Sequence, residues 1–231
     1  MFVLTIDQQG SRRVGDRVDE LLAMFATLPT TVAGAPGLVR PFERTVGDEV
    51  QAVFDDADVV VDLTLTVLRR GGWTVGIGAG PVDLPLPPTS RAGSGDAFVA
   101  ARVAVERAKS RVRAVPLAVE GADRVAAADA EAVLTLVAAV GERRTAAGWE
   151  VIDALRAPGV GSRQEDVAHR LGISQQAVSQ RLRTALWAEE LAARPLAARL
   201  LVAAAAAAGV EVDGRVEVDG RVEAVGRKVE T

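Results

Sequence analysis

The side chains best placed to do chemistry in this chain lie in a short polar segment, residues 164–182. Its pattern predicts two helices joined by the turn Gly172-Ile173-Ser174. Gly172 can adopt the positive φ of a tight turn, and the Ser174 hydroxyl can cap the second helix. Ala168 is small, so the two helices can approach closely. This combination is typical of a helix-turn-helix, which places its second helix in the major groove of DNA.

The second of these helices is expected to present an amide-rich outer face, while the apolar residues of both helices form a buried seam. Glutamine can read adenine edges, serine can contact either base type, and arginine can contact guanine or phosphate. We therefore predict a DNA-contacting set made of Ser174, Gln175, Gln176, Ser179, Gln180 and Arg183. The segment also resembles the helix-turn-helix of bacterial regulators and sigma-factor-like domains. The alternative is an ordinary helical hairpin with a polar outer face.

Composition narrows the other chemistry open to this chain. The 231 residues include no cysteine and one histidine, His169, and carry a formal net charge of −4. A disulfide scaffold, thiolate zinc sites, a cysteine nucleophile and a multi-histidine metal site are therefore excluded. The hydrophobic fraction of 49% and the charged fraction of 25% are typical of a globular protein. The groups left to carry the chemistry of this chain are carboxylates, arginines and backbone amides.

The elements that would position these groups follow from hydrophobic periodicity. Residues 2–119 predict the order β-α-β-β-α-β-α-β, and the first six elements match the split βαβ, ferredoxin-like arrangement. The expected strands are 2–7, 38–46, 50–54, 73–80 and 114–119, and the expected helices are 14–28, 57–68 and 96–110. The predicted fold class is therefore α+β.

The rest of the chain predicts helices. They are expected at 126–156, interrupted near Gly141 and Gly148, at 163–171, at 175–190, and from Pro195 onwards. We therefore expect three parts: a ferredoxin-like domain at 1–122, an all-α domain at 123–209 with its helix-turn-helix at 163–189, and a tail at 210–231. The tail repeats with period six, which favours a mobile low-complexity segment over short hairpins.

Two aspartates form a second candidate site. In a ferredoxin-like sheet the end of the first strand lies beside the turn between the second and third strands, so Asp7 is expected near Asp48. Two carboxylates there could share a magnesium ion and hold the phosphates of a nucleotide. The alternative is structural: Asp48 favours the turn conformation and Asp7 ends a strand.

Motifs around these aspartates resemble a known family. Residues 42–54, with Gly47-Asp48-Glu49, are similar to the hairpin of class III nucleotide cyclases, and residues 75–82 are similar to their glycine-rich strand. The SatD family of uncharacterised bacterial proteins is the closer resemblance, through 47–51, 76–78, and Ala101-Arg102 with Lys109. It covers about residues 2–119.

The cyclase resemblance implies roles for individual residues. Asp7 and Asp48 fall at the two metal aspartates, Arg102 falls at the transition-state arginine, and Arg44 falls at a base-selecting position. Phe98 stands where the family has an asparagine that orients the ribose. The resemblance therefore implies binding of magnesium with a nucleotide more than cyclisation.

Taken together, these patterns predict a cytoplasmic DNA-binding transcriptional regulator with a degenerate cyclase-like domain for sensing or dimerisation. The expected partners are double-stranded DNA and a second copy of the chain. No membrane partner is expected, because the longest apolar stretch, residues 200–210, is too short to span a bilayer. The alternatives are a magnesium-dependent nucleotidyl cyclase or related enzyme, and a non-catalytic assembly module.

Overall fold

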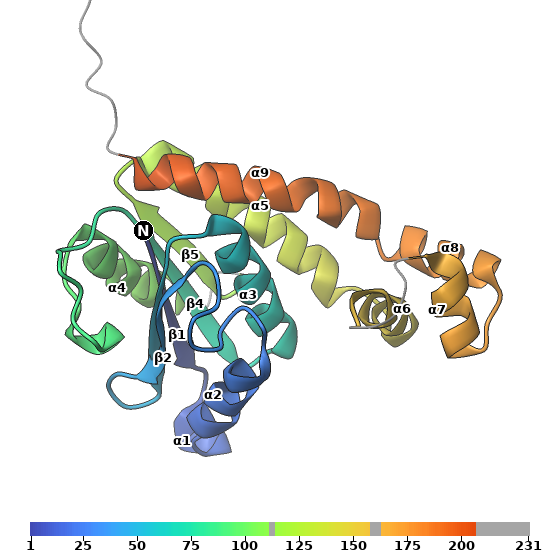
Figure 1. Cartoon of the computed structure of the whole chain (residues 1–231), viewed down its shortest axis with the longest axis horizontal. Coiled ribbons are helices and arrows are strands. Elements are labelled where there is room, and N and C mark those ends of the chain that lie inside the picture. Colours follow the sequence, from blue (N-terminus) through green and yellow to red (C-terminus); the bar gives the residue numbers. More distant parts are fainter. Residues whose placement is uncertain (111–113, 158–162, 207–231) are drawn as a thin grey trace, which may run out of the picture.

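The computed structural model describes residues 1–110, 114–157 and 163–206. Its fold is mixed α+β, and Figure 1 shows a sheet-containing part from which two long helices extend to a smaller helical part. The strands are β1 (Phe2–Gln8), β2 (Leu38–Arg44), β3 (Glu49–Phe54), β4 (Trp73–Ala79) and β5 (Leu117–Gly121). The helices are α1 (Ser11–Val14), α2 (Val18–Thr27), α3 (Ala57–Arg70), α4 (Asp96–Ala108), α5 (Arg124–Glu142), α6 (Ala146–Arg156), α7 (Gln164–Leu171), α8 (Gln175–Thr184) and α9 (Trp187–Ala205), with a 3₁₀ turn at Ser90–Ala92.

The sheet has the strand order β2-β3-β1-β4-β5. The central strand β1 runs antiparallel to both neighbours, β3 and β4, and β5 joins the outer side of β4 in parallel. The pairing sets Asp7 opposite Glu49 on one side and opposite Thr74 on the other. The register therefore fixes Asp7 at the end of the central strand.

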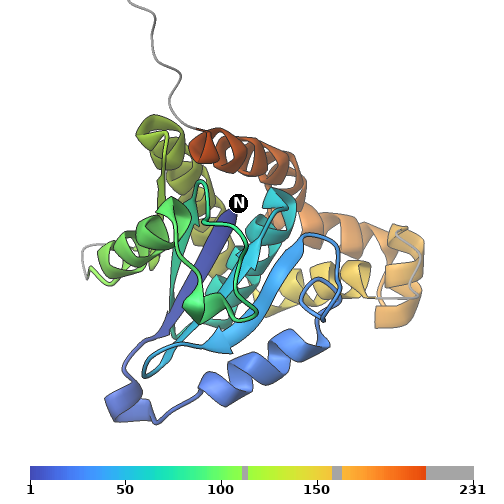
Figure 2. The same ribbon diagram turned by 60° about the vertical axis from the view of Figure 1, so that its left-hand side comes forward.

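The two faces of the sheet are covered differently. Side chains alternate along a strand, so Leu4 and Ile6 point into the main core while Val3 packs beneath α4. Helix α4 lies very close to β4, because a Cβ on Gly76 would stand 2.7 Å from the Cα of Val105. Figure 2 shows α4 over one face, opposite the other helices. The close approach of α4 brings its C-terminal end to the level of Asp7.

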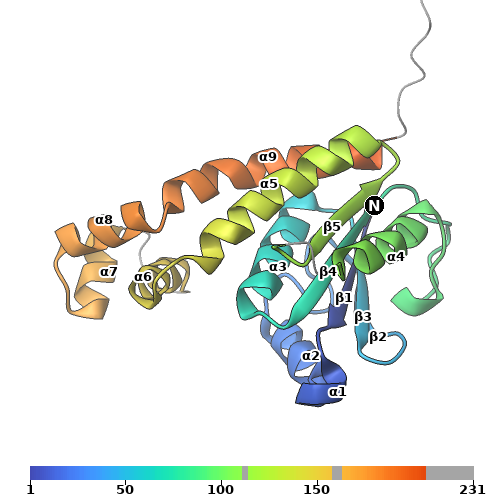
Figure 3. The same ribbon diagram turned by 180° about the vertical axis from the view of Figure 1, so that it is seen from behind.

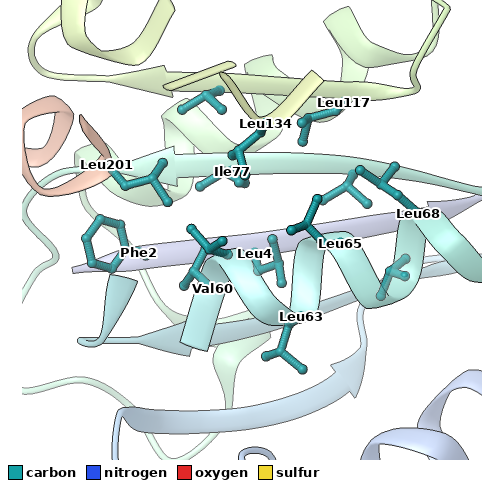
Figure 4. Packing of buried hydrophobic residues seen from close by; sticks show 14 of the residues in the cluster. Phe2, Leu4, Val60, Leu63, Leu65, Leu68, Ile77, Leu117, Leu134 and Leu201 are labelled. Atoms are coloured by element: carbon teal, nitrogen blue, oxygen red, sulfur yellow. The ribbon is translucent and has the colours of Figure 1, made fainter. Parts of the chain in front are cut away.

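The main core lies on the opposite face, under α3, α5 and α9. Figure 4 shows Leu4 and Ile77 of the sheet meeting Leu65 of α3, Leu134 of α5 and Leu201 of α9. Helices α5 and α9 therefore belong to the same packed core as the sheet. The expected domain boundary at residue 122 does not coincide with a break in this packing.

A smaller helical part lies at the far end of α5 and α9. Helices α6, α7 and α8 pack around Val151, Val167 and Val178, and Figures 1 and 3 show them beyond the edge of the sheet-containing part. Within the described residues, no helix is long and apolar enough to cross a membrane.

Several expected helix boundaries were wrong. The helix expected at 14–28 begins only at Val18, as α2, because Gly15 adopts a φ of +82° and separates it from the short α1. The interruption expected near Gly141 falls after Glu142, and Gly148 lies inside α6, where the Thr145 side chain caps the first turn. The last strand begins at Leu117 instead of residue 114.

The largest corrections concern α8 and α9. The helix expected at 175–190 ends at Thr184, and Leu186 breaks it with a φ of +51°. Pro195 was expected to begin a helix but lies inside α9. It sits on the exposed side, where water can satisfy the carbonyl of Leu191 that would otherwise accept from residue 195. The predicted tail at 210–231 lies outside the described residues.

Candidate functional site

The turn between α7 and α8 is built as the sequence pattern requires. Gly172 takes a φ of +63° and a ψ of +31°, in the left-handed region. The N–H of Ile173 donates to the carbonyl of Ala168 at 3.1 Å, and the Ala177 N–H donates to the Ser174 Oγ at 3.1 Å. The turn therefore ends one helix and caps the next within three residues.

The two helices are held by a third. Val151 and Ala154 of α6 pack with Val167 and Ala168 of α7 and with Val178 of α8, and partly buried leucines and an isoleucine complete the cluster: Leu155, Leu171, Ile173 and Leu182. All of the apolar residues predicted for the seam lie in this cluster. The polar side of α8 consequently faces away from α6 and α7.

The outer face of α8 presents uncharged hydrogen-bonding groups. Gln175, Gln176 and Gln180 are exposed and Ser179 is half-buried. Arg183 is exposed and donates to the Gln180 Oε1 at 2.7 Å. Among the predicted DNA-contacting residues, Ser174 differs because its Oγ already accepts the capping hydrogen bond. The remaining five form one accessible polar face.

Positive charge surrounds this face. Residues 163–184 hold four arginines and two acids. Arg163 and Arg170 are exposed on and before α7, as is His169, while Arg181 pairs with Glu150 of α6 at 2.8 Å. Arg163 pairs with the exposed Glu165 at 3.2 Å, and the excess of arginines in this segment favours contacts with phosphates.

The acidic site lies at the end of β1, on the face covered by α4. The Nζ of Lys109, at the C-terminal end of α4, is 3.1 Å from the Asp7 Oδ2, and the Asp7 side chain is only 16% exposed. The Gln8 N–H donates to the Asp48 carbonyl at 3.2 Å, which sets Asp48 beside the end of β1. The structure thus brings together Asp7, Asp48 and Lys109.

The electrostatics of Asp7 reflect competing effects. Burial raises the pKa of Asp7, and the nearby carboxylates of Asp48 and Glu49 raise it further, while the ion pair with Lys109 opposes the shift. Burial lowers the pKa of Lys109, but hydrogen bonds to Glu106 and Asp7 outweigh it, so the pKa of Lys109 is raised overall. Asp7 therefore has its positive partner within the chain.

A cleft opens beside this pair. It has a volume of about 590 Å³ and is lined by Asp7 and Lys109 together with mostly polar or small residues, including Gln9, Gly72 and Thr74. In the described part of the chain, no three histidine or acidic side chains are grouped to hold a metal ion. Asp7 lines this cleft but Asp48 does not, so a magnesium ion there would need most of its oxygens from a ligand, such as the phosphates of a nucleotide.

The two arginines predicted for this site lie elsewhere. Arg44 pairs with Asp16 at 2.8 Å and reaches Asp19 at 3.6 Å, so it is engaged beside α2. Arg102 is exposed on α4, about two turns before Lys109. Lys109 is the cation that meets Asp7. In the sequence, Lys109 stood out only as one of the residues that carry the SatD resemblance, with no role assigned to it.

Phe98, at the position of the family asparagine, has a packing role. It belongs to the apolar cluster of Val3, Val53 and Ala97 between α4 and the sheet, and its ring fills the space beside Gly93. A side chain held in this cluster does not present a polar group to the cleft.

A buried ionic junction between the two parts of the molecule had no predicted role. Arg144 and Glu190 have side chains 1% and 4% exposed, and their Nη1 and Oε2 atoms are 2.5 Å apart. Arg144 also donates from Nε to the Ala185 carbonyl at 2.7 Å, and Arg194 donates from Nε to Glu190 at 2.9 Å. This junction ties the start of α9 to the turn between α5 and α6.

No protein-family model matches this chain, and neither does any curated protein or solved structure. The functional interpretation therefore rests on the geometry of the chain itself.

Proposed function

We propose that this protein is a DNA-binding transcriptional regulator in which α7 and α8 form a helix-turn-helix and α8 is the recognition helix. One observation carries the proposal: a serine-capped helix, joined by a glycine turn to the helix before it, exposes a row of glutamines in a segment that also exposes arginines. Such a face has both the groups that read base edges and the cations that position a duplex.

In this proposal the side chains have separate tasks. Gln176 and Gln180 are exposed one helical turn apart on α8 and read base edges, with Arg183 one turn further on. Arg163 and Arg170 contact phosphates. Because phosphate contacts carry no sequence information, their loss should weaken binding equally on all duplexes.

The test is selection of a preferred duplex from a random pool, followed by titration of the full chain. We expect Gln176→Ala with Arg183→Ala to lower affinity for the selected site by about 2–6 kcal/mol in total, at about 1–3 kcal/mol per base contact. Arg12→Ala, an exposed arginine on α1, is the matched control and should leave affinity unchanged. Unaltered affinity in the double variant would refute the assignment of α8.

A second candidate function is supported by the cleft beside Asp7. The two aspartates, with Lys109 nearby, could bind a magnesium-nucleotide, as the cyclase resemblance implies. The strand order, with β1 antiparallel to both β3 and β4, supports a ferredoxin-like, cyclase-related domain for the first part of the chain. The apolar packing of Phe98 argues for ligand sensing without cyclisation.

The sensing role can be tested separately from DNA binding. In thermal melts of the parent chain, ATP or GTP with magnesium should raise the melting temperature. The stabilisation should be about 2.7 kcal/mol at a hundredfold excess of the ligand over its dissociation constant. Asp48→Asn should remove this response. Melts that stay unchanged in the parent would remove the nucleotide site while leaving the DNA-binding proposal intact.

A further inference from the structure

Helix α9 is apolar on sides that the other described residues leave exposed. Ala197, Leu201 and Ala204 are buried against the core, yet Leu196 is 40% exposed on the outer side. Between residues 191 and 206 the only charged side chains are Arg194, which turns inward to Glu190, and Arg199. A helix that is apolar all round is normally covered all round.

The neighbouring helix α5 continues this apolar surface. Its segment 132–141 carries no charge, and Leu136 is 69% exposed. Leu136 and Val140 line a shallow hollow of about 160 Å³ with Leu186 and Ala193 of the α9 side. Figure 3 shows α5 and α9 running next to each other across the molecule, and this hollow joins the exposed apolar residues of the two helices.

Two charges on the exposed side of α9 favour a second copy of the chain as the occupant: Glu189 lines the hollow beside α5, and Arg199 lies further along, by Asp55 and Asp58. Glu189 and Arg199 are both exposed, and neither makes an ion pair with any residue that the structure describes. They lie ten residues apart, which is about 15 Å along the helix. In an antiparallel pair of α9 helices crossing at residue 194, each Glu189 meets the Arg199 of the other copy.

The same register matches side-chain sizes. A two-fold axis at residue 194 sets Ala192 of each copy against Leu196 of the other copy. A small residue opposite a large one allows the helices to interdigitate. Charge and size therefore agree on one self-complementary arrangement, which is the property that a two-fold interface requires.

We propose that the exposed face of α9, extended by Leu136 and Val140 of α5, is the dimerisation surface of this protein. Two copies pair with their α9 helices antiparallel about a two-fold axis near residue 194. The pairing buries the apolar face and forms two Glu189–Arg199 ion pairs between the copies.

This arrangement has a consequence for DNA that rests on the proposed function. Leu186, where α9 begins, lies eight residues from the axis, so the two Leu186 residues are about 24 Å apart. The α6–α8 units extend further outward from these points (Figure 1). Half-sites one turn of DNA apart are separated by about 34–36 Å, a spacing that such a pair could span.

Charge reversal tests the ion pairs. By light scattering at micromolar concentration, the full chain of 24.1 kDa should run at twice that mass. Glu189→Arg and Arg199→Glu should each weaken the dimer about thirtyfold or more, because each turns two attractions into repulsions. The doubly reversed chain restores both pairs and should dimerise again. Arg12→Glu is the control and should remain dimeric.

Cysteine cross-linking tests the register, since the parent chain has no cysteine. Glu189→Cys mixed with Arg199→Cys should form a disulfide-linked heterodimer under mild oxidation. Either variant alone should not, because its two cysteines would lie about 15 Å apart along the helix, beyond disulfide reach. Thermal melts of each variant verify folding.

A monomeric parent, a dimer insensitive to both reversals, or equal cross-linking in the single-variant samples would overturn the proposal. The outcomes separate it from the DNA-binding proposal. A dimer with these properties that binds no duplex would remove only the proposed function, and a monomer that binds a selected duplex would remove only the dimer surface.

Discussion

Replacing Glu190 by alanine should be among the most damaging single changes in this protein. Its carboxylate is 4% exposed and serves two guanidinium groups, those of Arg144 and Arg194. Removing one partner of a buried ion pair leaves an uncompensated charge, which typically costs about 3–5 kcal/mol. Since small proteins are stable by only about 5–15 kcal/mol, this loss is a large part of the total.

Two companion variants separate the charge effect from loss of packing. Arg194→Ala should cost clearly less than Glu190→Ala, because Arg194 is 16% exposed and Glu190 keeps Arg144 as its partner. The double change Arg144→Met with Glu190→Leu removes the buried pair and keeps the volume, and Arg194 keeps Asp62 as its partner at 2.6 Å, so the double variant should be close to neutral. The three variants are therefore expected to differ in how much stability they lose.

Urea unfolding at 25 °C, followed by circular dichroism, measures these differences. The expected order of destabilisation is Glu190→Ala, then Arg194→Ala, then the Met/Leu double variant. A cost below about 1 kcal/mol for Glu190→Ala, or a double variant as unstable as that single one, would refute the argument that a buried charge balance holds this junction.

Three further changes probe the fold and the sites. Gly78→Ala should destabilise strongly in urea unfolding, since its Cβ would collide with the carbonyl oxygen of Ala97; a loss under 1 kcal/mol would contradict the close approach of α4. Ser174→Ala should lower the free energy of unfolding by about 0.5–2 kcal/mol, because the helix cap is lost. Ser174→Gly should lower it by less than Ser174→Ala does. The pKa of Asp7 is raised in the folded protein, so its contribution to the free energy of unfolding is complete below the ordinary value of 3.8. That contribution is lost as the pH rises through the folded-state pKa. The Asp7→Asn variant lacks this loss and should therefore gain stability relative to the parent as the pH rises above about 4. A stability difference between Asp7→Asn and the parent that stays constant from pH 4 to 7 would contradict this.

Local sequence determined most of the elements and the turn between α7 and α8. A short apolar run that ends at polar residues is enough to predict β1, and a glycine followed by a capping serine is enough to end one helix and begin the next. The neighbourhood of Asp7 and Asp48 was predicted only through the expected sheet topology, in which the hairpin of β2 and β3 lies beside β1.

Only the tertiary structure decided where α8 ends and which cation meets Asp7. The pattern of residues 175–190 is continuously helical, but the Arg144 side chain binds the Ala185 carbonyl and the chain turns at Leu186. Lys109 reaches Asp7 because glycines of β4, distant in sequence, allow α4 to approach the sheet. These outcomes depend on contacts between residues far apart in the chain, which periodicity within one segment does not encode.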